Sequence, residues 1–141
     1  MYVDSNIFVF AALDSDERGE NARKIIELAE DGKIAIFISP LVFDEVLQII
    51  QKLANKKVSE HIGRSLLSLS SWLDVTYNGS VYAFEYYQTG LVPRDSMHTG
   101  IMRDYGITVI LSEDSDFDSV PYIKRRTLKE VLNEYLDNES H

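Results

Sequence analysis

The sequence contains no cysteine, only three prolines and one tryptophan. Without cysteine, the chain can form neither a disulfide nor a thiolate metal site. This composition is compatible with a reducing cytoplasm, where we expect the protein to reside. Repeats, low-complexity stretches and Pro/Gly-rich linkers are also missing. We therefore expect a single domain that spans residues 1–141.

Long hydrophobic runs are absent as well. Residues 2–3 are apolar, but no basic region precedes them and no stretch approaches the roughly 20 apolar residues that cross a bilayer. We expect neither a signal peptide nor a membrane span. A composition that is 45% hydrophobic and 26% charged is typical of a globular fold with a proper core.

Positive charge is scarce. The chain has 14 lysines and arginines against 23 aspartates and glutamates, which gives a formal net charge of −9. Taken alone, this charge disfavours a nucleic-acid partner, because contact with phosphates favours a basic surface. A bound divalent cation supplies positive charge locally, so an acidic chain can still act on nucleic acid.

Apolar periodicity and capping residues predict strands that alternate with helices. Strands are predicted over residues 2–3, 34–38, 75–77 and 107–111. Helices are predicted over residues 6–13, 18–30, 40–54, 59–72, 80–87, 94–105 and 129–136. Ser39 and Ser59 are the expected caps of the third and fourth helices, and Gly106 is the expected glycine after the sixth. The alternation favours a parallel sheet covered by helices on both faces.

Acidic side chains lie where the strands of such a sheet would end. Asp4 ends the first strand, and Asp114 and Asp116 follow the last one. Glu45 lies in the helix after the second strand, and Asp95 opens the helix before the last strand. Because the crevice of an open parallel sheet lies beyond the carboxyl ends of its strands, these side chains can face one pocket. Clustered carboxylates repel one another without a cation, and oxygen-only ligands suit Mg²⁺ or Mn²⁺.

The order and spacing of these acids resemble the PIN-domain signature over essentially the whole chain. The resemblance is carried by Glu45 and by the blocks Val3-Asp4-Ser5-Asn6, Asp95-Ser96-Met97-His98 and Ser112-x-Asp114-x-Asp116-Phe117. It implies a three-layer α/β/α sandwich with a parallel sheet of four or five strands, and RNA cleavage that depends on Mg²⁺ or Mn²⁺. It implies that Asp4, Glu45, Asp95 and Asp114 are catalytic, and that Asp4, Asp95, Asp114 and Asp116 serve the metal. Asn6 and Ser112 would orient carboxylates or waters through hydrogen bonds.

Single-domain PIN proteins of this length are similar to VapC toxins, which form homodimers and are held inactive by an antitoxin protein. The resemblance therefore implies a homodimer and an antitoxin partner. The chain departs from the family at Thr99-Gly100-Ile101, where alanines are usual. A glycine inside a helix costs about 1 kcal/mol relative to alanine, but it can permit a close helix contact.

Several features also have an ordinary structural interpretation. Asp4 is a good helix cap, and Asp95 at a helix start complements the helix dipole. We interpret His98, one turn after Asp95, as a hydrogen-bonded neighbour and leave it out of the catalytic set. We interpret the basic residues 124–126 as solvated surface rather than an RNA contact, and residues 82 and 86 as core or dimer interface.

Two other functional classes compete with the nuclease. The first is a non-catalytic PIN-like module for RNA binding or assembly, although the intact acidic set argues against it. The second is a phosphoryl-transfer fold. A receiver domain needs paired acids early, and a haloacid-dehalogenase-type phosphatase needs Asp-x-Asp at the first strand. The chain has only Asp4-Ser5-Asn6 there.

Overall fold

A short parallel sheet lies at the centre of the molecule. The computed structural model describes residues 1–69 and 71–140. Strands β1 (Tyr2–Val3), β2 (Val109–Leu111) and β3 (Lys124–Arg126) pair in the order β1-β2-β3, and both pairings are parallel. Tyr2 lies opposite Ile110, and Val3 lies opposite Leu111. The parallel α/β class predicted from the sequence is confirmed.

Two further segments extend the sheet through single bridges. Phe37 pairs with Tyr2, and Ile38 pairs with Trp72, both in parallel. The predicted 34–38 strand is thus reduced to its last two residues, of which Phe37 pairs with β1 and Ile38 pairs with Trp72. The predicted 75–77 strand is wrong: Thr76 caps a helix by accepting a hydrogen bond from Gly79 N at 2.9 Å, so the helix begins at Tyr77.

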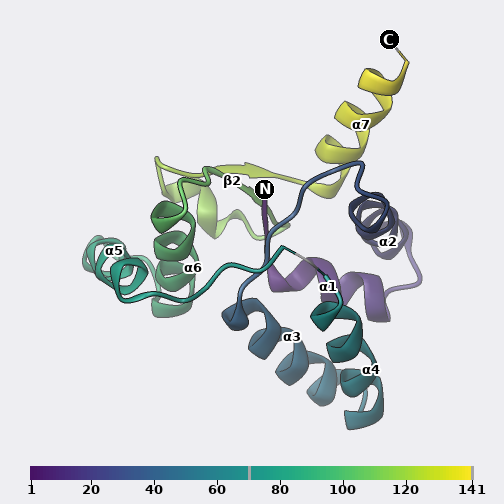
Figure 1. The fold of residues 1–141 in the computed structure, drawn as a ribbon, viewed down its shortest axis with the longest axis horizontal. Helices are drawn as coiled ribbons and strands as arrows, with labels where there is room; N and C mark the ends of the chain where they lie inside the picture. Colours follow the sequence, from purple (N-terminus) through teal and green to yellow (C-terminus); the bar gives the residue numbers. More distant parts are fainter. Residues whose placement is uncertain (70, 141) are drawn as a thin grey trace.

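Seven α-helices surround these strands in the described part of the chain (Figure 1). Helices α5 and α6 lie on one side of the strands, α2 and α7 lie on the other, and α3 and α4 form a pair beneath them. Their bounds are α1 Ser5–Leu13, α2 Glu17–Glu30, α3 Pro40–Leu53, α4 Lys56–Leu67, α5 Tyr77–Gln88, α6 Pro93–Asp104 and α7 Leu128–Glu139. A 3₁₀ helix, η1 (Ser115–Ser119), follows β2.

The start of α4 corrects a predicted cap. Asn55, not Ser59, caps this helix, because its Oδ1 accepts a hydrogen bond from Val58 N at 2.9 Å. Ser59 is buried inside α4, and its hydroxyl donates to the Leu47 carbonyl of α3 at 2.9 Å. The helix ends at Leu67, whereas the prediction extended it to residue 72 and across residue 70, which lies outside the described residues.

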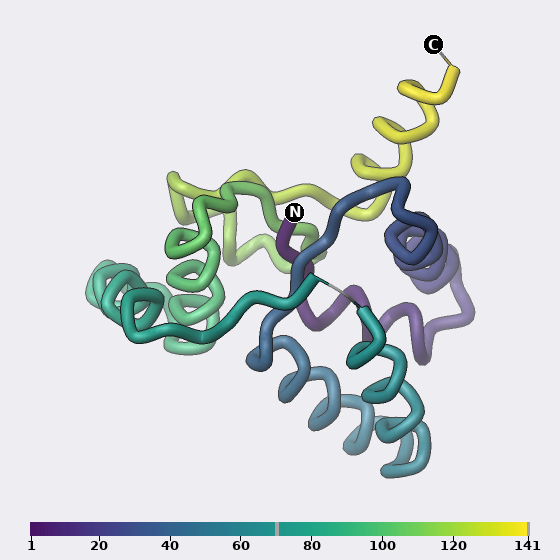
Figure 2. Tube along the Cα trace, viewed as in Figure 1, coloured from purple at the N-terminus to yellow at the C-terminus, as the bar shows by residue number. Residues whose placement is uncertain are grey.

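The path of the chain brings its two halves together (Figure 2). The amino terminus lies at the centre beside β2, and α7 projects from the body, with its carboxyl end far from the strands. No helix among the described residues has the length and hydropathy needed to cross a membrane.

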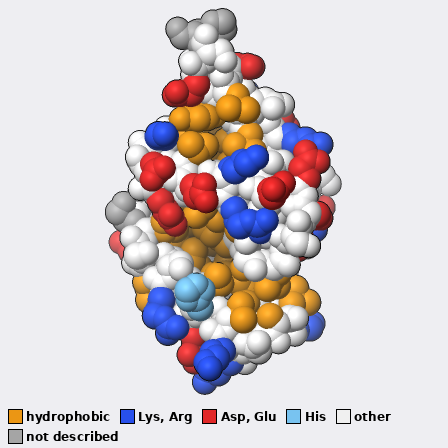
Figure 3. All heavy atoms as spheres, turned by 90° about the vertical axis from the view of Figure 1, so that its right-hand side faces the viewer, with side chains coloured by type: hydrophobic (Ala, Val, Ile, Leu, Met, Phe, Trp, Pro, Cys, Tyr) orange, Lys and Arg blue, Asp and Glu red, His pale blue; other side chains and the backbone are white. Residues whose placement is uncertain are grey.

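Seen from the α2 side, charged side chains of both signs form a band above a hollow with a hydrophobic floor (Figure 3). A hollow of about 290 Å³ lies between α1, α2 and α4, and its lining includes Phe8, Ile26, Ile62 and Leu66. This hollow contains none of the predicted site residues.

Candidate active site

The ends of β1 and β2 bring Asp4 and Ser112 into contact. The Ser112 hydroxyl donates to Asp4 Oδ2 at 2.6 Å, and the Ser5 backbone N–H donates to Asp4 Oδ1 at 2.8 Å. Ser112 Oγ also accepts from the Asp114 N–H at 3.0 Å and from Asn6 Nδ2 at 3.4 Å. One buried hydroxyl therefore ties together the two acidic segments that follow neighbouring strands.

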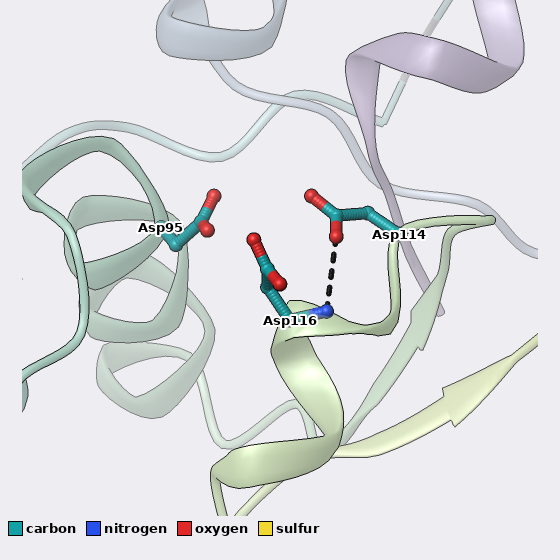
Figure 4. Close-up of side chains that lie close together, drawn as sticks. All are labelled: Asp95, Asp114 and Asp116. Carbon is teal, nitrogen blue, oxygen red and sulfur yellow. Dashed lines mark hydrogen bonds between the residues drawn. The ribbon is translucent and has the colours of Figure 1, made fainter.

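Three aspartates point toward one another (Figure 4). Asp95, Asp114 and Asp116 each offer one carboxylate oxygen, and these oxygens all lie within 4.8 Å of one another. Asp95 comes from the first turn of α6, whereas Asp114 and Asp116 belong to the turn that opens η1. Asp114 Oδ1 accepts from Asp116 N at 2.9 Å, which fixes the turn that presents both side chains.

Burial and like charge make Asp95 and Asp4 costly to ionise. Burial and then the carboxylates of Asp114 and Asp4 raise the pKa of Asp95 to about 6. Burial also raises the pKa of Asp4, although the hydrogen bond from Ser112 opposes the shift. The site therefore concentrates negative charge that no lysine or arginine among the described residues neutralises by an ion pair.

Glu45 lies apart from the three clustered aspartates. It projects from α3, and Oε1 contacts His98 Nε2 while Oε2 accepts from the Ser5 hydroxyl at 3.4 Å. His98 is 1% exposed, and its Nδ1 lies 2.7 Å from the Tyr2 hydroxyl. Of the predicted acids, the structure thus groups Asp95, Asp114 and Asp116 most closely, with Asp4 beside them and Glu45 on a separate histidine contact.

The basic residues 124–126 form strand β3. Arg125 forms a paired hydrogen bond with Asp118, at 2.8 and 3.0 Å, and donates to the Ser112 carbonyl at 3.1 Å. Arg126 pairs with Glu134. The interpretation of this triplet as plain solvated surface is therefore wrong for Arg125, which fastens the η1 turn to the sheet.

The family match covers most of the chain. The model of the PIN domain family matches residues 1–122 of the chain. The chain belongs to the PIN domain family. No curated protein sequence matches it.

Three solved structures with the same fold are VapC proteins or contain them. VapC20 of Mycobacterium tuberculosis, a toxin that cleaves the sarcin–ricin loop, has a TM-score of 0.71 and 16% identity, with 86% of this chain and 95% of that chain covered. VapBC2 of Rickettsia felis, bound to a promoter DNA fragment, has a TM-score of 0.69 and 19% identity, with 89% of this chain and 96% of that chain covered. DNA-bound VapBC of Salmonella typhimurium has a TM-score of 0.70 and 17% identity, with 90% of this chain and 96% of that chain covered.

The donor set of this PIN domain fits a hard divalent cation. Every clustered ligand atom is a carboxylate oxygen, and a cation would offset the burial and the repulsion that together raise the pKa of Asp95. Asn6 Oδ1 is buried and has no hydrogen-bond partner among the described residues, which leaves one more oxygen acceptor beside Ser112. Asp95, Asp114 and Asp116 would hold the ion, with Asp4 next to them.

Proposed function

We propose that this PIN domain is an endoribonuclease that depends on Mg²⁺ or Mn²⁺ and hydrolyses phosphodiester bonds in RNA. The observation that carries the proposal is the meeting of Asp95, Asp114 and Asp116 within 4.8 Å, at the carboxyl ends of a parallel sheet. A bound divalent ion would supply a Lewis acid and an activated water for displacement at phosphorus.

A groove beside the cluster offers room for the substrate. It has a volume of about 830 Å³, and its lining includes Asp95 and Asp116 together with Tyr86, Val92 and Pro121. Apolar and aromatic surfaces suit unpaired bases, which stack without regard to sequence. No lysine or arginine appears among the described residues that line the groove, so we expect single-stranded RNA to be held by base contacts and by the metal rather than by phosphate–lysine pairs.

The chain's own residues hold this arrangement in place. Ser112 holds Asp4 by donating a hydrogen bond, and the Asp114 carboxylate accepts from its own turn. Arg125 anchors the same turn to β3 through Asp118 and the Ser112 carbonyl. These contacts preorganise the acids before any substrate arrives, which is what electrostatic catalysis requires.

We further propose that the protein is the toxin of a toxin–antitoxin pair and forms a homodimer in the cytoplasm. Two VapBC structures and one further toxin–antitoxin complex share its fold. The exposed apolar side chains of α5, which include Tyr77, Val81 and Phe84, offer a surface for self-association.

A cleavage assay tests the main proposal. Purified protein is incubated with single-stranded and double-stranded RNA pools, with Mg²⁺ or Mn²⁺ and with excess chelator. We expect cleavage of single strands that chelator abolishes and that Asp114→Asn lacks. Cleavage that persists in chelator would overturn the metal requirement.

The net charge of −9 favours one competing function, a non-catalytic PIN-like binding or assembly module. Tight, metal-independent binding of a protein or RNA partner, without turnover by antitoxin-free protein, would support that module instead.

A further inference from the structure

A chain of buried polar groups runs from the sheet to Glu45. The Tyr2 hydroxyl lies 2.8 Å from Ser39 Oγ and 2.7 Å from His98 Nδ1, and His98 Nε2 contacts Glu45 Oε1. Tyr2 and Ser39 are fully buried, and His98 is 1% exposed. Four residues from three segments, β1, α3 with its cap Ser39, and α6, therefore form one connected network, which is costly unless every member is paired.

The network fixes the direction of the histidine ring. A carboxylate only accepts hydrogen bonds, so Nε2 carries the proton that faces Glu45, and Nδ1 faces the Tyr2 hydroxyl. The Tyr2 and His98 rings also pack with centroids 5.5 Å apart and an interplanar angle of 56°. Both ring nitrogens are occupied and the ring is buried, so neither nitrogen is available to a substrate in the groove.

Glu45 is the end of the network that reaches the site. Its Oε2 accepts from the Ser5 hydroxyl at 3.4 Å, and the same hydroxyl lies 3.5 Å from Asp4 Oδ1. The Glu45 carboxylate is thereby held between α6, which carries His98 and Asp95, and α1, which begins next to Asp4. A glutamate side chain without these two contacts would sample many rotamers.

We propose that His98 is a positioning residue, held by Tyr2, that fixes the orientation of the Glu45 carboxylate toward Ser5 and Asp4, beside the aspartate cluster. The proposal rests on the nuclease function proposed above, in which Glu45 belongs to the acidic set. It assigns no proton transfer to His98. Tyr2, which belongs to β1, holds the His98 ring in place, and the ring in turn holds Glu45, which lies on α3.

A matched pair of substitutions separates the two contacts of the ring. In His98→Gln the amide nitrogen occupies the place of Nε2 and still donates to Glu45, but the contact with Tyr2 is lost. In His98→Asn the shorter amide lies near the place of Nδ1 and meets Tyr2, but it cannot reach Glu45. Neither amide can carry a proton back and forth at neutral pH, so the pair also distinguishes positioning from acid–base chemistry.

We expect His98→Gln, whose amide still donates to Glu45 without the support of Tyr2, to lower kcat by about tenfold, and His98→Asn to lower kcat on the order of 100-fold, both with little change in KM. In a Glu45→Gln background, adding His98→Asn should lower kcat little further, because Glu45, the residue that His98 positions, has already lost its charge. Melting curves accompany every variant. Equal losses in Gln and Asn, or losses that follow the melting temperatures, would overturn the proposal.

A spectroscopic readout is independent of cleavage. In ¹⁵N-labelled protein, the Nε2 proton of His98 should exchange slowly with water and give a resolved signal, which Glu45→Ala removes and Asp114→Asn leaves in place. A wild-type protein that shows this signal but cleaves no RNA would overturn the nuclease function while supporting the contact. An unchanged signal in Glu45→Ala would overturn the positioning of Glu45.

Discussion

At the residue scale, Asp114 combines two roles that a single substitution can separate. Its carboxylate belongs to the acidic cluster, and its Oδ1 also accepts a hydrogen bond from Asp116 N. Asparagine keeps an oxygen acceptor for the turn and removes the charge. The loss of the charge therefore affects the cluster without breaking the turn that presents it.

We predict that Asp114→Asn abolishes cleavage and leaves the metal-free protein as stable as wild type or more stable, because it relieves repulsion. At a hundredfold excess over its dissociation constant, an ion that binds only the folded form stabilises it by about 2.7 kcal/mol. Wild type should therefore melt very roughly 5–15 °C higher with Mn²⁺, and the variant much less so. Four melting curves test this. A destabilised variant that gains as much from Mn²⁺ as wild type would make Asp114 structural.

The raised pKa of Asp95 predicts that the stability of the metal-free protein depends on pH. Its pKa is raised to about 6 in the folded state, so between its unfolded value near 3.8 and pH 6 the folded protein binds more protons than the unfolded chain. The Asp95 contribution therefore stabilises the fold below about pH 4 and is lost as the pH rises through 6. After allowance for solvent screening, the effect is on the order of 1 kcal/mol.

Melting of chelator-treated wild type and Asp95→Asn at pH 5 and pH 7.5 checks this sign. Wild type should lose more stability than the variant on going to pH 7.5. A variant that loses as much as wild type would show that other groups carry the dependence.

The clustered acids and Asp4 could be predicted from the sequence because each lies next to a strand end or a helix start, and local sequence patterns indicate such positions. The interpretation of His98 as a hydrogen-bonded neighbour is confirmed, but its partners could not be predicted. Its ring meets Tyr2, which lies 96 residues earlier, and Glu45, which lies 53 residues earlier. Nothing in the spacing of a helical histidine one turn after an acid indicates which distant side chains will surround it.

At the scale of elements, the contact between α5 and α6 depends on Gly100. A Cβ at this position would lie 2.2 Å from the Gly79 carbonyl oxygen and 2.8 Å from Ala83 N. The glycine that departs from the family pattern therefore permits the close helix contact considered from the sequence. Because α6 also carries Asp95, the spacing of these helices sets the position of one clustered acid.

We predict that Gly100→Ala destabilises the protein by about 1–3 kcal/mol, because a forced backbone overlap outweighs the better helix propensity of alanine. Gly63→Ala in α4 is the matched control. The nearest atom to a Cβ there would be the end of the Leu47 side chain, at 3.0 Å, which can move aside, and the Phe43 ring would lie at an ordinary contact distance of 3.7 Å. Chemical denaturation of both variants measures the difference. Equal effects would show that the α5–α6 contact is not tight in solution.

Element boundaries mark where local sequence patterns fail. Ser59 and Asn55 are both good caps, and only the contact of the Ser59 hydroxyl with α3 shows that Ser59 lies inside α4. Strand β3 consists of Lys124, Arg125 and Arg126, which no apolar pattern indicates. It forms at the edge of the sheet because β2 offers an unpaired side, and Arg125 finds Asp118 there.

At the scale of the whole molecule, α5 presents an apolar face to solvent. Phe84 is 58% exposed and Tyr77 is 82% exposed, on the side of the molecule opposite α7 (Figure 1). Large exposed apolar side chains that share one helix mark an association surface. Two-fold dimers are the commonest soluble oligomers, which agrees with the proposed homodimer.

We predict that wild type sediments as a dimer at micromolar concentration and that Phe84→Arg shifts it toward monomer. Leu136→Arg is the control, because Leu136 on α7 has the same 58% exposure on the far side of the molecule. Analytical ultracentrifugation distinguishes the two. Monomeric wild type, or dissociation by Leu136→Arg alone, would contradict the α5 interface.

The hydrogen bond between Ser112 and Asp4 joins residues that are 108 positions apart. During translation, the chain must therefore extend beyond β2 and η1 before the first acid meets the last ones, although Asp4, Glu45 and Asp95 have long been synthesised. Contacts of such long range form late in folding. A ribosome that is making this protein would thus carry a chain with no assembled site until residues 114–116 have emerged, and stalled chains that end before Asp114 should leave added RNA intact. The topology itself delays the proposed activity until both halves of the site have been synthesised.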